Sequence, residues 1–257
     1  MSAVEIRDGI LHVAVSSAAN GTSLDRDAKI AGAEVLNSSA ATDGSIRAIL
    51  LYGAGANFCA GGNVRAFAAA EDRPEYILGL ATDFHRFIDV LSRVDIPVVA
   101  AVHGWAAGAG MSIVTHADIA IGGTSTQFRP AYLGIGLSPD GGLTWSLPRV
   151  VGAARARDII LSNRILDATE AERIGLLSRI VADDEVYDTA LAAAQEIANG
   201  PSASARATRR LLNASGFATL ADQLDAEAQS ISQLSGSPTG IEGVDAFVGK
   251  RKPVWPN

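Results

Sequence analysis

The chain reads IPVVAAVHGWAAGAG at residues 96–110, and this stretch decides the fold. Residues 97–102 form a short apolar run of the kind that makes a buried strand. The glycine-rich segment at residues 104–110 follows directly and predicts a tight turn that opens a helix. A strand, a glycine turn and a helix in succession favour an α/β protein.

The same region requires a test for a membrane span. Residues 96–114 carry no formal charge and contain a G-x-x-x-G spacing, a pattern also found in membrane helices. Pro97, His103 and the glycines interrupt the apolar run, and no basic flank follows it. We therefore expect no membrane-spanning helix here.

Strands and helices alternate before this stretch, and helices dominate after it. We expect strands at residues 4–7, 10–15, 46–52, 97–102 and 118–121, and helices at 24–36 and 73–93. From Gly152 onward the pattern is almost entirely helical: 153–161, 169–175, 184–199, 202–215, 220–234 and 239–249. The Gly200-Pro201 breaker then divides an α/β core at residues 1–199 from a helical oligomerisation segment at residues 200–257.

Composition narrows the class of function. The 257 residues are 48% hydrophobic and 19% charged, enough for a substantial core. The formal net charge of −7 argues against a nucleic-acid surface, which would need clustered lysine and arginine. Cys59 is the single cysteine, which fits a reducing cytoplasm. The histidines have no metal-ligand spacing, so we expect no metal site: His12, His85, His103 and His116.

One acid stands at a turn in residues 130–142, which read PAYLGIGLSPDGG. Pro139 and the two glycines after Asp140 favour a bend directly after an apolar run. A carboxylate that faces an apolar wall loses hydration and can act as a general base near neutral pH. The alternative is an ordinary turn in which Asp140 caps the following helix.

Two glycine-rich turns each follow a predicted strand, at residues 57–63 and 104–111. Small residues let a ligand approach the backbone, and the N–H groups at a helix start carry partial positive charge. Two such groups that converge would form an oxyanion hole. If they do not converge, both segments are only close-packed turns.

Several segments in the same order resemble the crotonase superfamily, the enoyl-CoA hydratase/isomerase family. They are FCAGGN at 58–63, IPVVAAVHG at 96–104 with AAGAG at 106–110, ADIAI at 117–121, residues 134–148, and FVGKRKP at 247–253. Asn63 departs from the aspartate that is usual in the first of these. The resemblance covers nearly the whole chain.

This resemblance implies a spiral of ββα units with a C-terminal α-helical trimerisation segment, and a homotrimer or hexamer. The implied ligand is an acyl-CoA thioester, so coenzyme A is part of the substrate and no separate cofactor is expected. The implied enolate-stabilising amides are those of Ala60 and Ala109. Lys250 resembles a position that contacts the CoA phosphates, although exposed lysines are also common. The remaining substrate-binding candidates are Gly61, Gly62, Gly108, Ser112 and Tyr132.

The departures from the family pattern favour one reaction. Ser112 and Tyr132 stand where the hydratases of the family carry two glutamates, so we doubt efficient hydration. Asp140 falls where the isomerases often place their acid. We therefore expect an enoyl-CoA isomerase in which Asp140 moves a proton between two carbons while backbone amides hold the enolate.

Three alternatives remain open. Asp140 could be a nucleophile in aroyl-CoA dehalogenase-like or hydrolase-like chemistry, with His85 at the histidine position of the dehalogenases. The chain could also bind acyl-CoA with little turnover. A dinucleotide-binding oxidoreductase fits poorly, because the G-x-G that begins at Gly53 has Phe58 where the third glycine belongs.

Overall fold

In a computed structural model of the chain, which describes residues 3–256, six strands form the main sheet. Their order is β1 (Val4–Arg7), β2 (Ile10–Ser17), β3 (Ala48–Ala54), β4 (Val98–Val102), β6 (Ile119–Gly123) and β9 (Arg179–Val181). The β1–β2 hairpin is antiparallel and every later pair is parallel. Residues 1–2 of the predicted core and residue 257 of the predicted C-terminal segment lie outside the described part of the chain.

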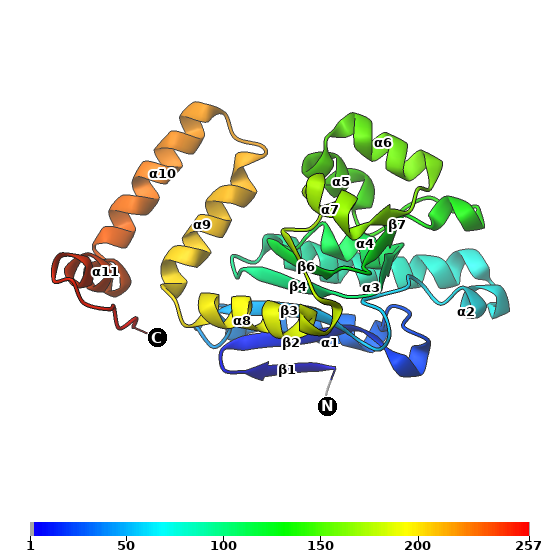
Figure 1. Ribbon diagram of the computed structural model, residues 1–257, viewed down its shortest axis with the longest axis horizontal. Coiled ribbons are helices and arrows are strands. Elements are labelled where there is room, and N and C mark those ends of the chain that lie inside the picture. The colour runs from blue at the N-terminus through cyan, green and yellow to red at the C-terminus, as the bar shows by residue number, and fades with distance from the viewer. Residues whose placement is uncertain (1–2, 257) are drawn as a thin grey trace.

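Both faces of this sheet are buried, which explains why its central strands are apolar throughout. Val98, Ala100 and Val102 lie in the core shared with α1 (Arg26–Leu36) and α3 (Arg73–Arg93). Val99 and Ala101 point to the opposite core, against α8 (Val186–Ala198). The alternation follows from the two-residue period of a strand. Helices therefore cover the sheet on both sides, as Figure 1 shows.

A second, smaller sheet supports the segment between β4 and β6. It contains β5 (Trp105–Ala107), β7 (Gln127–Arg129) and β8 (Leu166–Asp167). Short helices complete this half of the molecule: α2 (Val64–Ala69), α4 (Ala109–Val114), α5 (Leu143–Val151), α6 (Ala153–Ser162) and α7 (Ala168–Arg173). The structure confirms an α/β protein with helices at its C-terminus. The pattern expected after Gly152, almost entirely helical, omitted β8 and β9, which lie between the predicted helices and each pair with an earlier strand.

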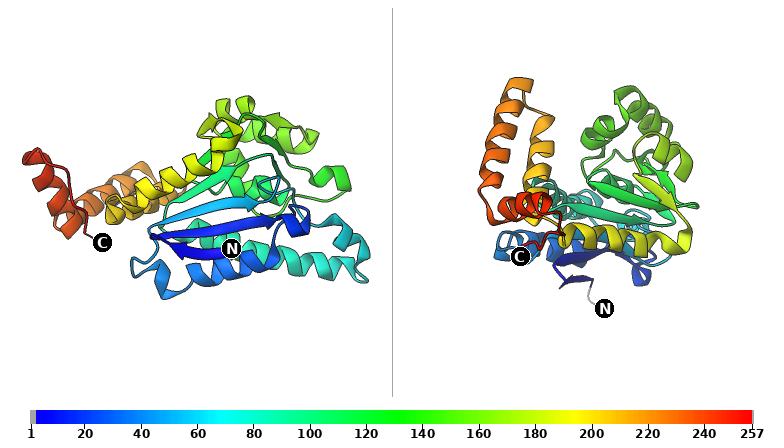
Figure 2. Two further views of the ribbon diagram at one scale, coloured as in Figure 1. Left: turned by 60° about the horizontal axis from the view of Figure 1, so that its bottom comes forward. Right: turned by 60° about the vertical axis from the view of Figure 1, so that its left-hand side comes forward.

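Three C-terminal helices form an arm beside the core: α9 (Ser202–Ser215), α10 (Leu220–Ser235) and α11 (Pro238–Val248). The arm begins directly after Gly200-Pro201, and it projects from the body in all three views (Figures 1 and 2). Each described helix falls short of the length or the apolarity that crossing a bilayer demands. The stretch around residues 96–114 is instead divided among β4, β5 and α4.

A buried arginine ties the arm to the core. Arg209 on α9 is 4% exposed, and its Nε donates to Asp118 Oδ2 at 2.6 Å. Its other nitrogens donate to the carbonyl oxygens of Leu91 and Val94, at the end of α3. The same Asp118 oxygen accepts the Val98 N–H at 2.7 Å, where β4 begins. One guanidinium therefore joins the arm, a helix and the central strand.

We predict that Arg209→Met lowers the free energy of unfolding by about 1–3 kcal/mol, because it leaves the carbonyls of Leu91 and Val94 and the partly exposed Asp118 carboxylate without their donor. Arg210→Met is the matched control, since the exposed Arg210 side chain pairs with Asp95 and such pairs contribute about 1 kcal/mol or less. Urea unfolding at one fixed protein concentration measures both. Equal losses in the two variants would contradict the role given to Arg209.

Candidate active site

The two glycine turns identified in the sequence converge. Cys59, after β3, pairs in parallel with Ala106 of β5: its N–H donates to Trp105 O at 3.0 Å, and its C=O accepts from Ala107 N–H at 2.9 Å. This pairing brings Gly61 against Gly108. A β-carbon on Gly108 would lie 3.6 Å from Gly61 Cα, so the two backbones are in contact.

Two backbone amides are free beside this contact, and one of them differs from the prediction. The Ala60 N–H donates to Thr22 O at 2.9 Å, and the Gly61 N–H donates to the Cys59 thiol. Among residues 3–256, no acceptor lies within hydrogen-bond distance of the Gly62 N–H. The prediction that Ala60 supplies an oxyanion-hole amide does not fit this structure, because that N–H is already used; Gly62 has the available one.

The second predicted amide is free. Ala109 is the first residue of α4, so its N–H precedes the hydrogen-bonded turns of the helix. No other described group accepts from it. The Gly62 and Ala109 amides therefore flank the Gly61–Gly108 contact, where a carbonyl oxygen could accept from both.

The acid lies on the other side of Gly108. A β-carbon on Gly108 would be 3.9 Å from Tyr132 Cζ, and the Tyr132 hydroxyl donates to Asp140 Oδ1 at 2.6 Å. Asp140 is partly buried, so its carboxylate is held at the site rather than free in solvent. Burial and the neighbouring Asp140 charge raise the pKa of Tyr132, which keeps the phenol protonated and able to donate.

Ser112 has a different place from the one predicted. It was expected to contact substrate, but it is fully buried in α4, beneath Tyr132. Its Oγ lies 3.2 Å from Tyr132 Oη and donates to the backbone oxygen of Asp140 at 3.0 Å. Ser112 therefore holds the turn that carries the acid, and it presents no surface to a ligand.

Two histidines hold the next residue, Gly141, and sequence reasoning missed this role. The Gly141 N–H donates to His85 Nε2 at 3.1 Å, and the Gly141 C=O lies 3.2 Å from His116 Nε2. Burial lowers the pKa of His116. His85 comes from α3 and His116 follows α4, so three segments distant in sequence meet at the Asp140 turn. No local pattern in the chain indicates such contacts.

Tyr132 is held by strained backbone. Ala131 has φ +68°, a conformation that costs a non-glycine residue about 1 kcal/mol or more. The Ala131 N–H donates to Asn163 Oδ1 at 2.8 Å, which stabilises this conformation. Asn163 lies just beyond α6 and was not singled out in the sequence.

Lys250 is not brought to this site within one chain. It is exposed and follows α11 at the end of the arm, which lies away from α4 and α5 in Figures 1 and 2.

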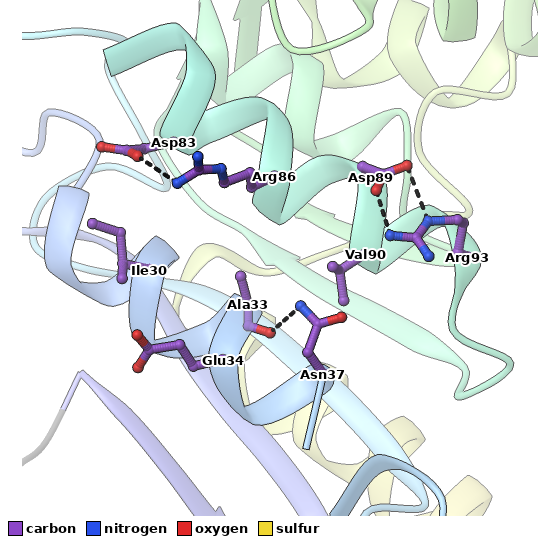
Figure 3. A pocket seen from close by; sticks show the side chains of 9 residues that line it. All are labelled: Ile30, Ala33, Glu34, Asn37, Asp83, Arg86, Asp89, Val90 and Arg93. Atoms are coloured by element: carbon purple, nitrogen blue, oxygen red, sulfur yellow. Dashed lines mark hydrogen bonds and ion pairs between the residues drawn. The ribbon is translucent and has the colours of Figure 1, made fainter. Parts of the chain in front are cut away.

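A groove of about 500 Å³ lies away from the candidate site, between α1 and α3. Figure 3 shows Asp83 paired with Arg86 and Asp89 paired with Arg93 along it, and none of the predicted site residues lines it. Within residues 3–256, no group of three or more histidine, cysteine or acidic side chains is arranged to hold a metal ion.

We predict that Gly141→Ala displaces the turn. Its β-carbon would lie 2.3 Å from Phe84 Cε1 and 2.9 Å from Ser112 Cβ, which adds about 1–3 kcal/mol of overpacking to the cost of its positive φ. Gly136→Ala is the control, because Gly136 has φ +72° but open space around its Cα. The free energy of unfolding of the two variants separates the cost of overpacking from the cost of the positive φ. If Gly141→Ala lowers it no more than Gly136→Ala does, the close contact with Phe84 is refuted.

The raised pKa of Tyr132 gives a second prediction. Ultraviolet difference titration of the wild type minus Tyr132→Phe should show no phenolate signal up to about pH 11, about one unit above the ordinary tyrosine pKa. A Tyr132 signal near pH 10 would mean that its hydroxyl is hydrated and not held on Asp140.

Comparison with known proteins agrees with this architecture. The family model for enoyl-CoA hydratase/isomerase matches residues 17–257. The chain is 36% identical to the 1,2-epoxyphenylacetyl-CoA isomerase of Escherichia coli strain K12 over 83% of this chain and 82% of that protein. It is 38% identical to a protein of Rhodobacter capsulatus described as a "probable enoyl-CoA hydratase", over 82% and 81%.

Solved structures confirm the predicted crotonase-like fold. An enoyl-CoA hydratase from Polaromonas sp. JS666 superposes with a TM-score of 0.91 at 30% identity, covering 98% of each chain. The match extends through the C-terminal helices as well as the α/β core. Fold, motif order and sequence similarity agree: the chain belongs to the enoyl-CoA hydratase/isomerase family.

Proposed function

We propose that this enzyme shifts a double bond in an enoyl-CoA thioester, with Asp140 as the acid and base. In this reaction Asp140 removes a proton from one carbon and returns it to another, so no water is added. The thioester oxygen, which gains negative charge in the enolate, accepts from the Gly62 and Ala109 amides. Donors fixed in the backbone need no reorganisation as that charge develops.

One observation carries the proposal. Among the described residues, Asp140 is the one acidic side chain hydrogen-bonded to Tyr132 or Ser112, the residues that replace the two hydratase glutamates. Addition of water requires one group to activate the water and another to supply or hold a proton. A serine and a neutral tyrosine provide no second carboxylate, whereas double-bond migration needs only one proton-transferring group.

The comparisons support an acyl-CoA enzyme and leave the reaction between two descriptions. The E. coli relative is described as an isomerase and the R. capsulatus relative as a hydratase. The contacts of His85 weaken the dehalogenase-like alternative. Its Nε2 already accepts the Gly141 N–H, so that nitrogen has no free lone pair with which to activate water.

We also propose that the arm assembles the protein into a homotrimer or a hexamer. Large apolar side chains on α10 and α11 are exposed in the single chain, among them Leu220, Ile231 and Phe247. A surface of this kind is typical of a protein–protein contact. A contact between Lys250 and the CoA phosphates would then come from a neighbouring copy.

The cytoplasmic location expected from the lone cysteine stays a prediction.

We predict that Asp140→Asn lowers kcat for a 3-enoyl-CoA by about 10²- to 10⁴-fold, because the amide cannot take up the proton. Binding of the acyl-CoA should persist, since the Gly62 and Ala109 amides are unchanged. Asp188→Asn, on the exposed surface of α8, is the matched control and should keep wild-type rates. Chromatography of the products separates isomerised, hydrated and hydrolysed thioesters.

Wild-type turnover in Asp140→Asn would show that another group is the base. A 3-hydroxyacyl-CoA product from the wild type would identify a hydratase, and halide release from an aroyl-CoA would identify a nucleophilic role for Asp140. Thioester binding without any product would identify a binding protein.

A further inference from the structure

One short hydrogen bond makes the two oxygens of the Asp140 carboxylate different from each other. Oδ1 accepts the Tyr132 hydroxyl at 2.6 Å, and within residues 3–256 no group donates to Oδ2. Bonds of this length between a hydroxyl and a carboxylate belong to the strong, charge-assisted class. Oδ1 is therefore occupied, and Oδ2 keeps its electron pairs for another proton.

The Tyr132 hydroxyl is held in place at both ends of its residue. Its ring lies against Gly108, where a β-carbon would be 3.9 Å from Tyr132 Cζ. On the backbone side, the Tyr132 C=O accepts the Leu137 N–H at 3.0 Å, and the preceding Ala131 N–H is bound by Asn163 Oδ1. The hydroxyl is therefore fixed relative to the Gly108 contact and does not follow a carboxylate that rotates.

The single proton of the Tyr132 hydroxyl has two possible acceptors. Its oxygen lies within hydrogen-bond distance of Asp140 Oδ1 and of Ser112 Oγ, which is 3.2 Å away. Ser112 has a proton of its own, which it donates to the Asp140 backbone oxygen, and a carboxylate is the stronger acceptor of the two. The Tyr132 proton therefore points at Oδ1.

This bond restricts the one motion that would exchange the two oxygens. The terminal torsion of an aspartate is broad and roughly two-fold, so an unbound carboxylate exchanges its oxygens by half a turn. In Asp140 that turn must break the bond with Tyr132. A double-bond shift needs one acid to serve two carbons of the same substrate, and an acid that rotates between the two steps carries its proton away from them.

We propose that Tyr132 is a positioning residue: it occupies Oδ1 of Asp140, so that Oδ2 alone takes the proton from one carbon and returns the same proton to the other. In the first step a C–H bond breaks, an O–H bond forms on Oδ2, and the electron pair moves into the thioester enolate. In the second step that O–H bond breaks, a C–H bond forms at the second carbon, and the carboxylate is restored. The transfer rests on the proposed function, whereas the bond between Tyr132 and Asp140 exists without substrate.

The transfer is tested with a 3-enoyl-CoA that carries two deuterium atoms at C2, in ordinary water. One deuterium stays at C2 of the product, and mass spectrometry shows whether the other has moved to C4 or has been lost to water. The wild type should keep the second deuterium at least about twofold more often than Tyr132→Phe, in which the carboxyl group has two equivalent orientations. Tyr132→Phe should also lower kcat by about tenfold with little change in KM.

Tyr187→Phe is the matched control, because it removes the same hydroxyl from an exposed residue on α8, on the other side of the main sheet. It should keep the wild-type share of label. This share is a ratio within each turnover, so a loss of folded protein does not alter it, and a tyrosine with only a structural role would leave it unchanged. Equal shares in the wild type and Tyr132→Phe would overturn the proposal, as would complete loss of the second deuterium in the wild type.

The hydrogen bond is tested separately in the ligand-free protein. Proton NMR should show a slowly exchanging hydroxyl signal that is lost in Tyr132→Phe and shifted in Asp140→Ala. Its absence from the wild type would overturn the proposal whatever the reaction is. Its presence together with wild-type turnover in Asp140→Asn would refute the proposed function, and the proton transfer with it, while the hydrogen bond itself would stand.

Discussion

The backbone pairing of Cys59 with Ala106 is the contact on which the rest of the site depends. It joins the loop after β3 to β5, and it presses Gly61 against Gly108. The two amides left free beside this contact belong to the fold and not to any side chain. A substitution can therefore leave the donors in place while the reacting side chains change. Such a frame can keep the same donors while different acids are presented to them.

The acid side of the site is built from contacts with a single turn. Ser112 holds the Asp140 carbonyl, His85 and His116 hold Gly141, and Tyr132 holds the carboxylate. These side chains come from α3, the region of α4 and the strained segment at Ala131. A short acid with few rotatable bonds, fixed at both ends of its turn, suits proton transfer between two nearby carbons of one substrate.

The sequence predicted the parts of the fold that depend on local patterns. Residues 46–52 and 97–102 were expected to be buried strands because they are continuously apolar, and they correspond to β3 and β4. β5, β7 and β8 are two or three residues long, and only pairing with distant segments makes them strands. β9 lies between two predicted helices and was not predicted, for the same reason. Length and period carry too little information for such elements.

The site residues also divide into those that local patterns predict and those that only tertiary contacts identify. Asp140 and Ala109 could be selected from turn chemistry, the helix start and the family resemblance. Ala60 could not be distinguished from Gly62 in this way, because the choice depends on a hydrogen bond to Thr22 far earlier in the chain. The contacts of His85, His116 and Asn163 are likewise tertiary.

A crystal structure of the protein with an unreactive acyl-CoA thioester bound is the most direct test of this site. The thioester oxygen should lie about 2.7–3.1 Å from the nitrogens of Gly62 and Ala109, with Asp140 facing the acyl carbons. A thioester oxygen bound away from these two amides would contradict it.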